Sequence, residues 1–160
     1  MVLANTFHIV VVKKNWLAFL NVPLSVIYFG KNKTLRGFVV LPFFSGTLVL
    51  LFSQLFGPFV VDLISDFLIG VGLGICYLLS ELPNSFVKRK LGIGNGEHSK
   101  KYKTVQMLID KADSLVGMLI FYYFVTEFNL LEVFLLFFLA LAISLSVSFI
   151  LHSTKIKKSF

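Results

Sequence analysis

Long apolar stretches constrain this chain more than any other feature of its sequence. A helix needs roughly 20 consecutive apolar residues to cross the hydrocarbon core of a bilayer. Four stretches meet or approach that length, over residues 37–61, 63–80, 112–128 and 130–152. A fifth, over residues 1–12, is short, but Lys13 and Lys14 after it suit a short or tilted span whose lysines reach the headgroups. With 57% hydrophobic and 14% charged residues, we predict an all-α integral membrane protein of about five transmembrane helices, one domain over residues 1–160.

Charge and cysteine content narrow the function classes. The first apolar stretch precedes its lysines, whereas a signal peptide carries positive charge before the apolar run. Cys76 is the only cysteine, so no disulfide framework exists. The net charge of +7 fits a nucleic-acid-binding protein, but on a membrane protein basic residues more often mark topology and contact with anionic lipids. We therefore expect membrane lipids as partners and no nucleic acid.

All 15 Lys and Arg residues lie in three segments, residues 13–36, 81–111 and 153–160. With five spans these segments share one side of the membrane, and the positive-inside rule places that side in the cytoplasm. The prediction is a multi-pass protein of the cell membrane, with its site facing the cytoplasm and its amino terminus outside. A four-span arrangement beginning at Gly37 keeps the same segments cytoplasmic but puts the amino terminus inside, and it remains open.

A polar segment follows the third apolar stretch. Pro83 suits the first turn of a helix, where its missing N–H is not needed. At about 100° per residue, that helix gathers its polar side chains on one face. The face contains Glu81, Asn84, Ser85, Lys88 and Arg89. An amphipathic helix lying in the headgroup region, without catalysis, is the alternative interpretation.

Asp110 and Asp113 share a helix face at the start of the fourth apolar stretch. Aspartate is a good N-cap, which accounts for one of them. A second ionised acid at the membrane boundary is expensive without a partner, and Mg²⁺ binds one or two protein carboxylates together with phosphate oxygens. With Lys88, Arg89 and Lys111 available to neutralise phosphates, the pattern indicates nucleotide-dependent phosphoryl or nucleotidyl transfer.

A second basic cluster precedes the second apolar stretch on the same side. Lys33 and Arg36 are either anchors at the membrane boundary or, with Thr34, donors to a phosphate. Their spacing does not choose between these interpretations. In the third stretch, Gly70 and Gly74 indicate a close helix-packing surface.

Two segments resemble a known signature. Residues 85–89, Ser-Phe-Val-Lys-Arg, and 110–114, Asp-Lys-Ala-Asp-Ser, are similar to the paired elements of the CTP-dependent phosphatidate cytidylyltransferases. Glu-Leu-Pro-Asn-Ser at 81–85, Gly-Ile at 92–93, Lys-Thr-Leu-Arg-Gly at 33–37 and Ala-Asn at 4–5 resemble more closely the small CDP-archaeol synthase branch, which has five predicted spans. The resemblance covers nearly the whole chain.

The resemblance implies an enzyme that joins CTP to a phospholipid acid, of archaetidic or phosphatidic type, to give a CDP-lipid and pyrophosphate with Mg²⁺. It implies Asp110 and Asp113 as metal ligands with Glu81 as a third acid, and a catalytic role for both aspartates and Lys88. The expected substrate contacts are Lys33, Thr34, Arg36, Asn84, Ser85, Arg89 and Lys111. Two other functions stay open, a CTP-dependent polyprenol or lipid kinase and a non-catalytic protein that binds anionic lipid. A homodimer is a further expectation.

Overall fold

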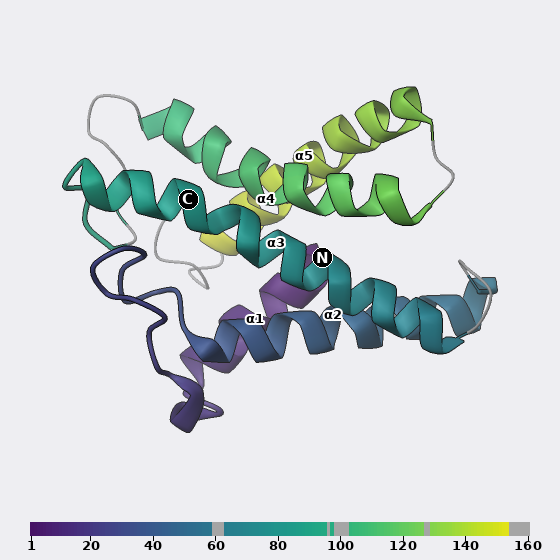
Figure 1. Cartoon of the computed structure of the whole chain (residues 1–160), viewed down its shortest axis with the longest axis horizontal. Helices are drawn as coiled ribbons and strands as arrows, with labels where there is room; N and C mark the ends of the chain where they lie inside the picture. The colour runs from purple at the N-terminus through teal and green to yellow at the C-terminus, as the bar shows by residue number, and fades with distance from the viewer. Residues whose placement is uncertain (59–62, 96, 98–102, 127–128, 154–160) are drawn as a thin grey trace.

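The computed structural model describes residues 1–58, 63–95, 97, 103–126 and 129–153. This part of the chain is helical and contains no β-strand, only an isolated bridge between Pro23 and Thr34. The elements in order are α1 (Val2–Lys13), η1 (Ala18–Leu20), α2 (Leu35–Phe56), α3 (Leu63–Lys90), α4 (Lys103–Val125) and α5 (Leu130–Ser153) (Figure 1). The predicted all-α class is confirmed.

Three helices of the described chain are long and apolar enough to cross a membrane, namely α2, α3 and α5. The apolar helix α1 has 12 residues, which agrees with the short first stretch. Helix α4 has 23 residues, and its charged side chains all lie in its first half. The helix count is consistent with the prediction of about five.

Helix boundaries differ from the sequence prediction at the polar segment. Helix α3 runs unbroken from Leu63 to Lys90, so the expectation that a new helix begins at Pro83 is wrong. Proline inside a helix removes one backbone hydrogen bond, a loss that membrane helices tolerate when neighbouring groups satisfy the freed carbonyl. The polar face of residues 81–89 therefore continues a spanning helix instead of forming a separate helix in the headgroup region.

The fourth apolar helix also starts earlier than expected. Helix α4 begins at Lys103, seven residues before Asp110, because the apolar side chains at Val105, Leu108 and Ile109 already follow a helical spacing. Both aspartates therefore lie inside the helix, and the N-cap interpretation of either residue is wrong. Most backbone N–H groups in a helix interior are bonded to carbonyls four residues earlier, so these carboxylates depend chiefly on side-chain partners.

Glycines bring α3 close to its neighbours. A Cβ added to Gly70 would lie 2.6 Å from the Cα of Gly46 in α2, and one added to Gly74 would lie 2.5 Å from the Cα of Pro42. On the other side, a Cβ on Gly117 of α4 would overlap the Ser80 hydroxyl of α3. The predicted packing surface is confirmed, and α2, α3 and α4 form the tightly packed part of the fold.

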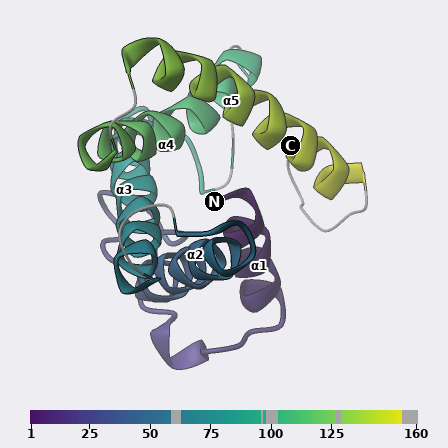
Figure 2. The ribbon, with the colours of Figure 1, turned by 90° about the vertical axis from the view of Figure 1, so that its right-hand side faces the viewer.

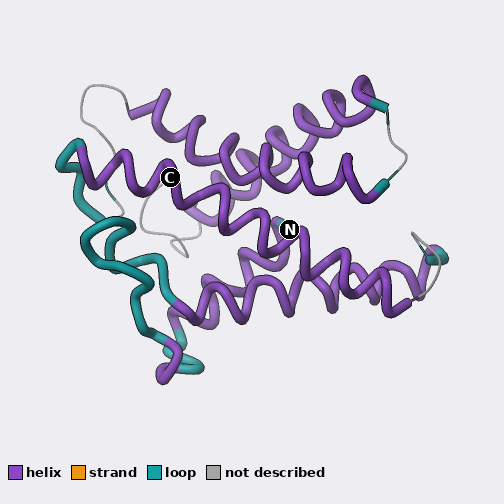
Figure 3. The backbone as a smooth tube through the Cα atoms, viewed as in Figure 1, coloured by secondary structure: helices purple, strands orange, loops and turns teal. Residues whose placement is uncertain are grey.

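Helix α5 packs on α4 and, more lightly, on α1, and it extends away from α2 and α3 (Figure 2). The loops after α1 and after α3 lie together at one end of the bundle, where α2 begins (Figure 3). The polar side chains of the described loop residues 14–34 and 91–95 are thereby collected at this end (Figure 3).

Candidate active site

The centre of the candidate site is a pair of carboxylates on α4 that face an amide on α3. The Nδ2 atom of Asn84 donates to Oδ1 of Asp110 at 2.7 Å and to Oδ2 of Asp113 at 2.7 Å. The aspartates share a helix face because they are three residues apart. One turn beyond Asn84 on α3, the Lys88 ammonium donates to Oδ2 of Asp110 at 2.5 Å. The structure thus brings together four of the predicted residues from two segments distant in sequence, and Asn84, predicted as a substrate contact, bridges the two aspartates.

A second group of contacts extends the cluster to α2. Lys33, just before α2, forms an ion pair with Glu81 on α3. The hydroxyl of Ser114 lies 2.9 Å from Oε1 of Glu81 and 3.1 Å from Oδ1 of Asp113. The backbone N–H of Ser114 also donates to Asp113 Oδ1 at 2.6 Å. The side chain of Ser114 therefore connects Glu81 to the aspartate pair.

Sequence reasoning assigned no role to Ser114. It is 1% exposed, and its hydroxyl lies between two acids on different helices. The sequence did contain an indication of this role. Ser114 lies one turn after Asp110 and therefore falls near the face of α4 that carries the aspartates. Its single hydroxyl hydrogen can be donated to only one of these acids at a time, so Ser114 joins Glu81 and Asp113 as a shared contact.

The carboxylate pair has the oxygen donors that a divalent cation prefers, and the binding of Mg²⁺ here stays a prediction. An Asn84 hydrogen-bond donor stands within 2.7 Å of an oxygen from each aspartate, so both oxygens face one small region of space. No group of three or more His, Cys, Asp or Glu side chains in the described residues is arranged to hold a metal. Mg²⁺ does not need such a group, since it binds through one or two carboxylates and keeps waters or phosphate oxygens. A direct role of Glu81 as a third ligand stays a prediction.

Other predicted phosphate contacts have partners within the protein. The guanidinium of Arg36, 4% exposed, donates to the Trp16 carbonyl and to Asn21 Oδ1, each at 3.2 Å. These contacts hold the loop after α1 against the start of α2. Thr34, the residue before α2, is 7% exposed. The geometry gives Arg36 a structural task, and the substrate contacts of both residues stay predictions.

Two polar residues of α3 make local contacts. The Ser85 hydroxyl donates to the Glu81 carbonyl of its own helix at 2.8 Å. Arg89 donates to the Gly94 carbonyl at 3.2 Å, which ties the end of α3 to the glycine-rich loop that follows. The predicted roles of Ser85 and Arg89 toward substrate stay predictions.

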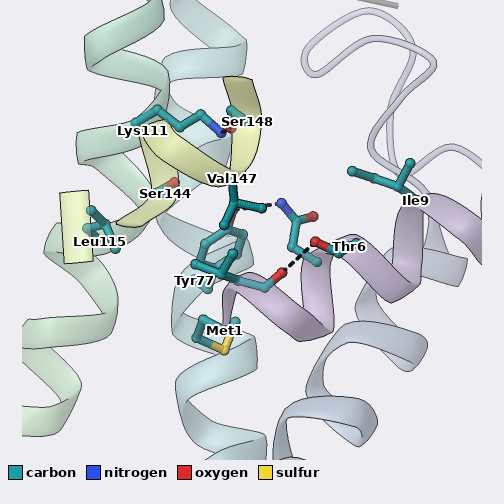
Figure 4. Close-up of a pocket in the computed structure, with 11 residues that line it drawn as sticks. Met1, Thr6, Ile9, Tyr77, Lys111, Leu115, Ser144, Val147 and Ser148 are labelled. Atoms are coloured by element: carbon teal, nitrogen blue, oxygen red, sulfur yellow. Dashed lines mark hydrogen bonds between the residues drawn. The ribbon is translucent and has the colours of Figure 1, made fainter. Parts of the chain in front are cut away.

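Lys111 contacts helix α5. Its ammonium donates to the hydroxyl of Ser148 on α5 at 2.5 Å. Consecutive helical residues differ by about 100°, which turns Lys111 toward α5 while its neighbour Asp110 faces α3. Figure 4 shows Lys111 and Ser148 together at one side of a small pocket, with Tyr77 and Thr6 farther along it.

That pocket has room for about one water molecule, at a volume of about 30 Å³. Its walls come from α1, α3, α4 and α5, and the amide of Asn5 contacts the Tyr77 hydroxyl at 3.4 Å. In this arrangement Lys111 links α4 to α5, and the predicted contact between Lys111 and substrate phosphate stays a prediction.

Comparison with known proteins identifies the family. Residues 24–160 match the family model described as CarS-like, CDP-archaeol synthase. The chain is 30% identical over 121 residues to the CDP-archaeol synthase of Staphylothermus marinus, an alignment that covers 74% of this chain and 62% of that protein. The chain therefore spans less than two thirds of the length of this relative. No solved structure matches the chain. The family match covers the carboxylate pair together with Asn84, Lys88 and Ser114, and the chain belongs to the CDP-archaeol synthase family.

Proposed function

We propose that this protein transfers the cytidylyl group of CTP to a phospholipid acid in the membrane, giving a CDP-lipid and pyrophosphate. The observation that carries the proposal is the meeting of Asp110 and Asp113 with Asn84 and Lys88 at the basic end of the bundle. Membership in the CDP-archaeol synthase family supports the same chemistry. The lipid itself, of archaetidic or phosphatidic type, belongs to the proposal.

Asp110 and Asp113 would hold Mg²⁺, which supplies neutralisation of triphosphate charge and of the charge that develops on the leaving group. Asn84 holds the two carboxylates toward the same region, so like charges stay close together without a direct contact. Lys88 balances part of their charge and would donate to a phosphate oxygen of the bound nucleotide. Glu81 forms an ion pair with Lys33 and contacts the Ser114 hydroxyl. Because Ser114 also contacts Asp113, this series of contacts fixes the position of Asp113.

In the proposed reaction an oxygen of the lipid phosphate attacks the α-phosphorus of CTP. A new phosphorus–oxygen bond forms, the bond from the α-phosphorus to the oxygen bridging to the β-phosphate breaks, and pyrophosphate leaves. A phosphate monoester is largely ionised at neutral pH, so the nucleophile needs no general base from the protein. The chain's residues therefore act by positioning and by electrostatics.

Turnover with labelled CTP tests this function. Purified protein in detergent, supplied with Mg²⁺, a phospholipid acid and CTP labelled in the α- or the γ-phosphate, is expected to place the α-label in lipid and the γ-label in pyrophosphate. A CTP-dependent lipid kinase would instead place the γ-label in lipid and release CDP. Absence of any turnover across a panel of ester- and ether-linked phospholipid acids contradicts the proposal and favours a non-catalytic lipid-binding protein.

Substitution of either aspartate tests the site. We expect Asp110→Asn and Asp113→Asn each to lower kcat at least about 100-fold, the scale on which loss of one well-placed electrostatic group acts. Glu97→Gln is the matched control, because Glu97 is an exposed acid of the nearby polar loop outside the cluster. If Asp110→Asn and Asp113→Asn were as active as Glu97→Gln, the carboxylate pair would have no role in the reaction.

A further inference from the structure

An apolar groove lies between α4 and α5, away from the polar cluster. Its volume of about 370 Å³ falls in the range typical of ligand-binding pockets, about 300–1,000 Å³. Helix α4 contributes Val116, Ile120 and Phe124, and α5 contributes Val133, Phe134 and Phe137. Tyr123 is the one lining residue whose side chain carries a polar atom. A groove of this composition suits a hydrocarbon ligand.

The groove starts beside the carboxylate pair. Val116 follows Asp113 by three residues and therefore lies on nearly the same face of α4. Ile120 and Phe124 continue along that face at intervals of four residues, so the groove extends about 12 Å along the helix from Val116. The side chains of Val116, Ile120 and Phe124 are 46%, 54% and 80% exposed, so the groove is open along this face.

We propose that this groove holds a hydrocarbon chain of the phospholipid-acid substrate, with its phosphate at Asp110 and Asp113. The inference rests on the proposed function. A phospholipid acid has an anionic head joined to apolar chains, and the surface of α4 offers a charged cluster followed directly by an apolar groove in the same order. Lys88 beside Asp110 supplies positive charge at the head end of this path.

The groove would favour the reaction by orienting the lipid substrate. Lipid chains are as apolar as the groove, so moving a chain from the bilayer into it gives no hydrophobic gain of the kind seen in water. A chain aligned along α4 would instead hold the lipid phosphate near the carboxylate pair, and such alignment accelerates a reaction between two bound groups. We therefore expect an effect on turnover of long-chain substrates with little effect on binding of CTP.

Filling the groove tests the proposal. Ile120→Trp is expected to lower kcat/KM for dioleoyl phosphatidic acid and its ether-linked counterpart about 10-fold, while leaving kcat/KM for dihexanoyl phosphatidic acid within about 2-fold of wild type. Ile75→Trp is the matched control, because Ile75 is an exposed isoleucine of α3 outside the groove, and we expect wild-type values for both substrates. Equal losses on long and short chains, or the same loss in Ile75→Trp, would overturn the proposal. Thermal unfolding checks that both variants fold.

A second measurement does not depend on turnover. Phosphatidic acid with a photoreactive group in its chain is expected to label peptides of α4 and α5 in the wild-type protein, with labelling reduced at least about 3-fold in Ile120→Trp. A phosphatidylcholine probe with the same chain should label these peptides less. Equal labelling by both probes would mean that bulk lipid fills the groove, and crosslinks between two chains through these helices would mean that a second copy covers it. Either result overturns the proposal. If wild-type protein shows no turnover but retains the selective labelling, the proposed function fails while the chain-binding groove stands.

Discussion

Helices α3 and α5 are both long and apolar, yet the fold holds them in different ways. In the most apolar window of α3, 22% of the residues are buried within the protein, against 6% in α5. Helix α3 approaches α2 through Gly70 and Gly74 and carries Asn84 and Lys88 toward α4. In a bilayer, apolar side chains gain little by contacting protein instead of lipid, so small residues and polar contacts decide where a helix lies. Helix α3 has both, and α5 is positioned mainly through α4.

The difference bears on the proposed function. A reacting group must stay within a fraction of an ångström of its productive position, and a tightly packed helix can hold it there. Helix α3 meets that need, because its glycine contacts fix the helix and its polar face then meets Asp110 and Asp113. Helix α5 contributes apolar surface, a role that tolerates small shifts.

The largest effect in this comparison is expected for Lys88→Met on α3. Loss of the ammonium beside Asp110 removes charge compensation from the carboxylate pair, and we expect kcat to fall about 100-fold with labelled CTP and phospholipid acid. Lys90→Met is the control, because Lys90 is exposed and its ammonium lies 4.8 Å from the centre of the Phe86 ring. Similar kcat values for Lys88→Met and Lys90→Met would show that the polar face of α3 does not contribute to catalysis.

Gly70→Ala tests the packing of α3 directly. The new methyl group would lie 2.6 Å from the Gly46 Cα and 2.7 Å from the Ser45 carbonyl oxygen, and a backbone contact of this kind cannot be relieved by a side-chain movement. We expect a loss of about 1–3 kcal/mol in the free energy of unfolding, measured by denaturation in detergent. Gly37→Ala serves as the control, because its methyl group would lie 3.5 Å from His8, an ordinary contact. An unchanged stability of Gly70→Ala would mean that α2 and α3 are not held at this distance.

The smallest effect is expected on α5. Ser148→Ala removes the acceptor that Lys111 contacts, and polar contacts between membrane helices contribute on average about 0.6 kcal/mol. Ser146→Ala is the matched control, because the exposed Ser146 hydroxyl donates to the Ala142 carbonyl of its own helix. We expect the Tm of Ser148→Ala in thermal unfolding to be slightly lower than that of Ser146→Ala. A loss for Ser148→Ala as large as that for Gly70→Ala would show that α5 is as tightly specified as α3.

Several parts of the fold were predictable because they depend on local properties. Length and hydropathy located all five helices, and the i, i+4 pair Gly70 and Gly74 correctly indicated close packing. The errors concern the start of α4 and the continuation of α3 through Pro83. Both arise because hydropathy marks the part of a helix inside the bilayer, whereas a helix can extend beyond the hydrocarbon as far as its backbone hydrogen bonds allow.

The sequence predicted which residues form the candidate site better than it predicted the contacts between them. Periodicity placed Asp110 and Asp113 on one face and Asn84 and Lys88 on another, and these faces meet in the structure. The direction of Lys111 toward Ser148 could not be predicted, since a basic residue between two aspartates reads as part of the same site. Its direction depends on where α5 crosses α4, which is a property of the packed fold.

By itself the sequence determined that this chain is helical and apolar enough to enter a membrane and that it belongs to its family, because these properties follow from the order and type of residues alone. Only the tertiary structure decided which side chains of α3 and α4 meet, that Arg36 holds a loop, and that an apolar groove lies between α4 and α5. Those outcomes depend on the distance and crossing of whole helices, which are set where glycines let two backbones approach.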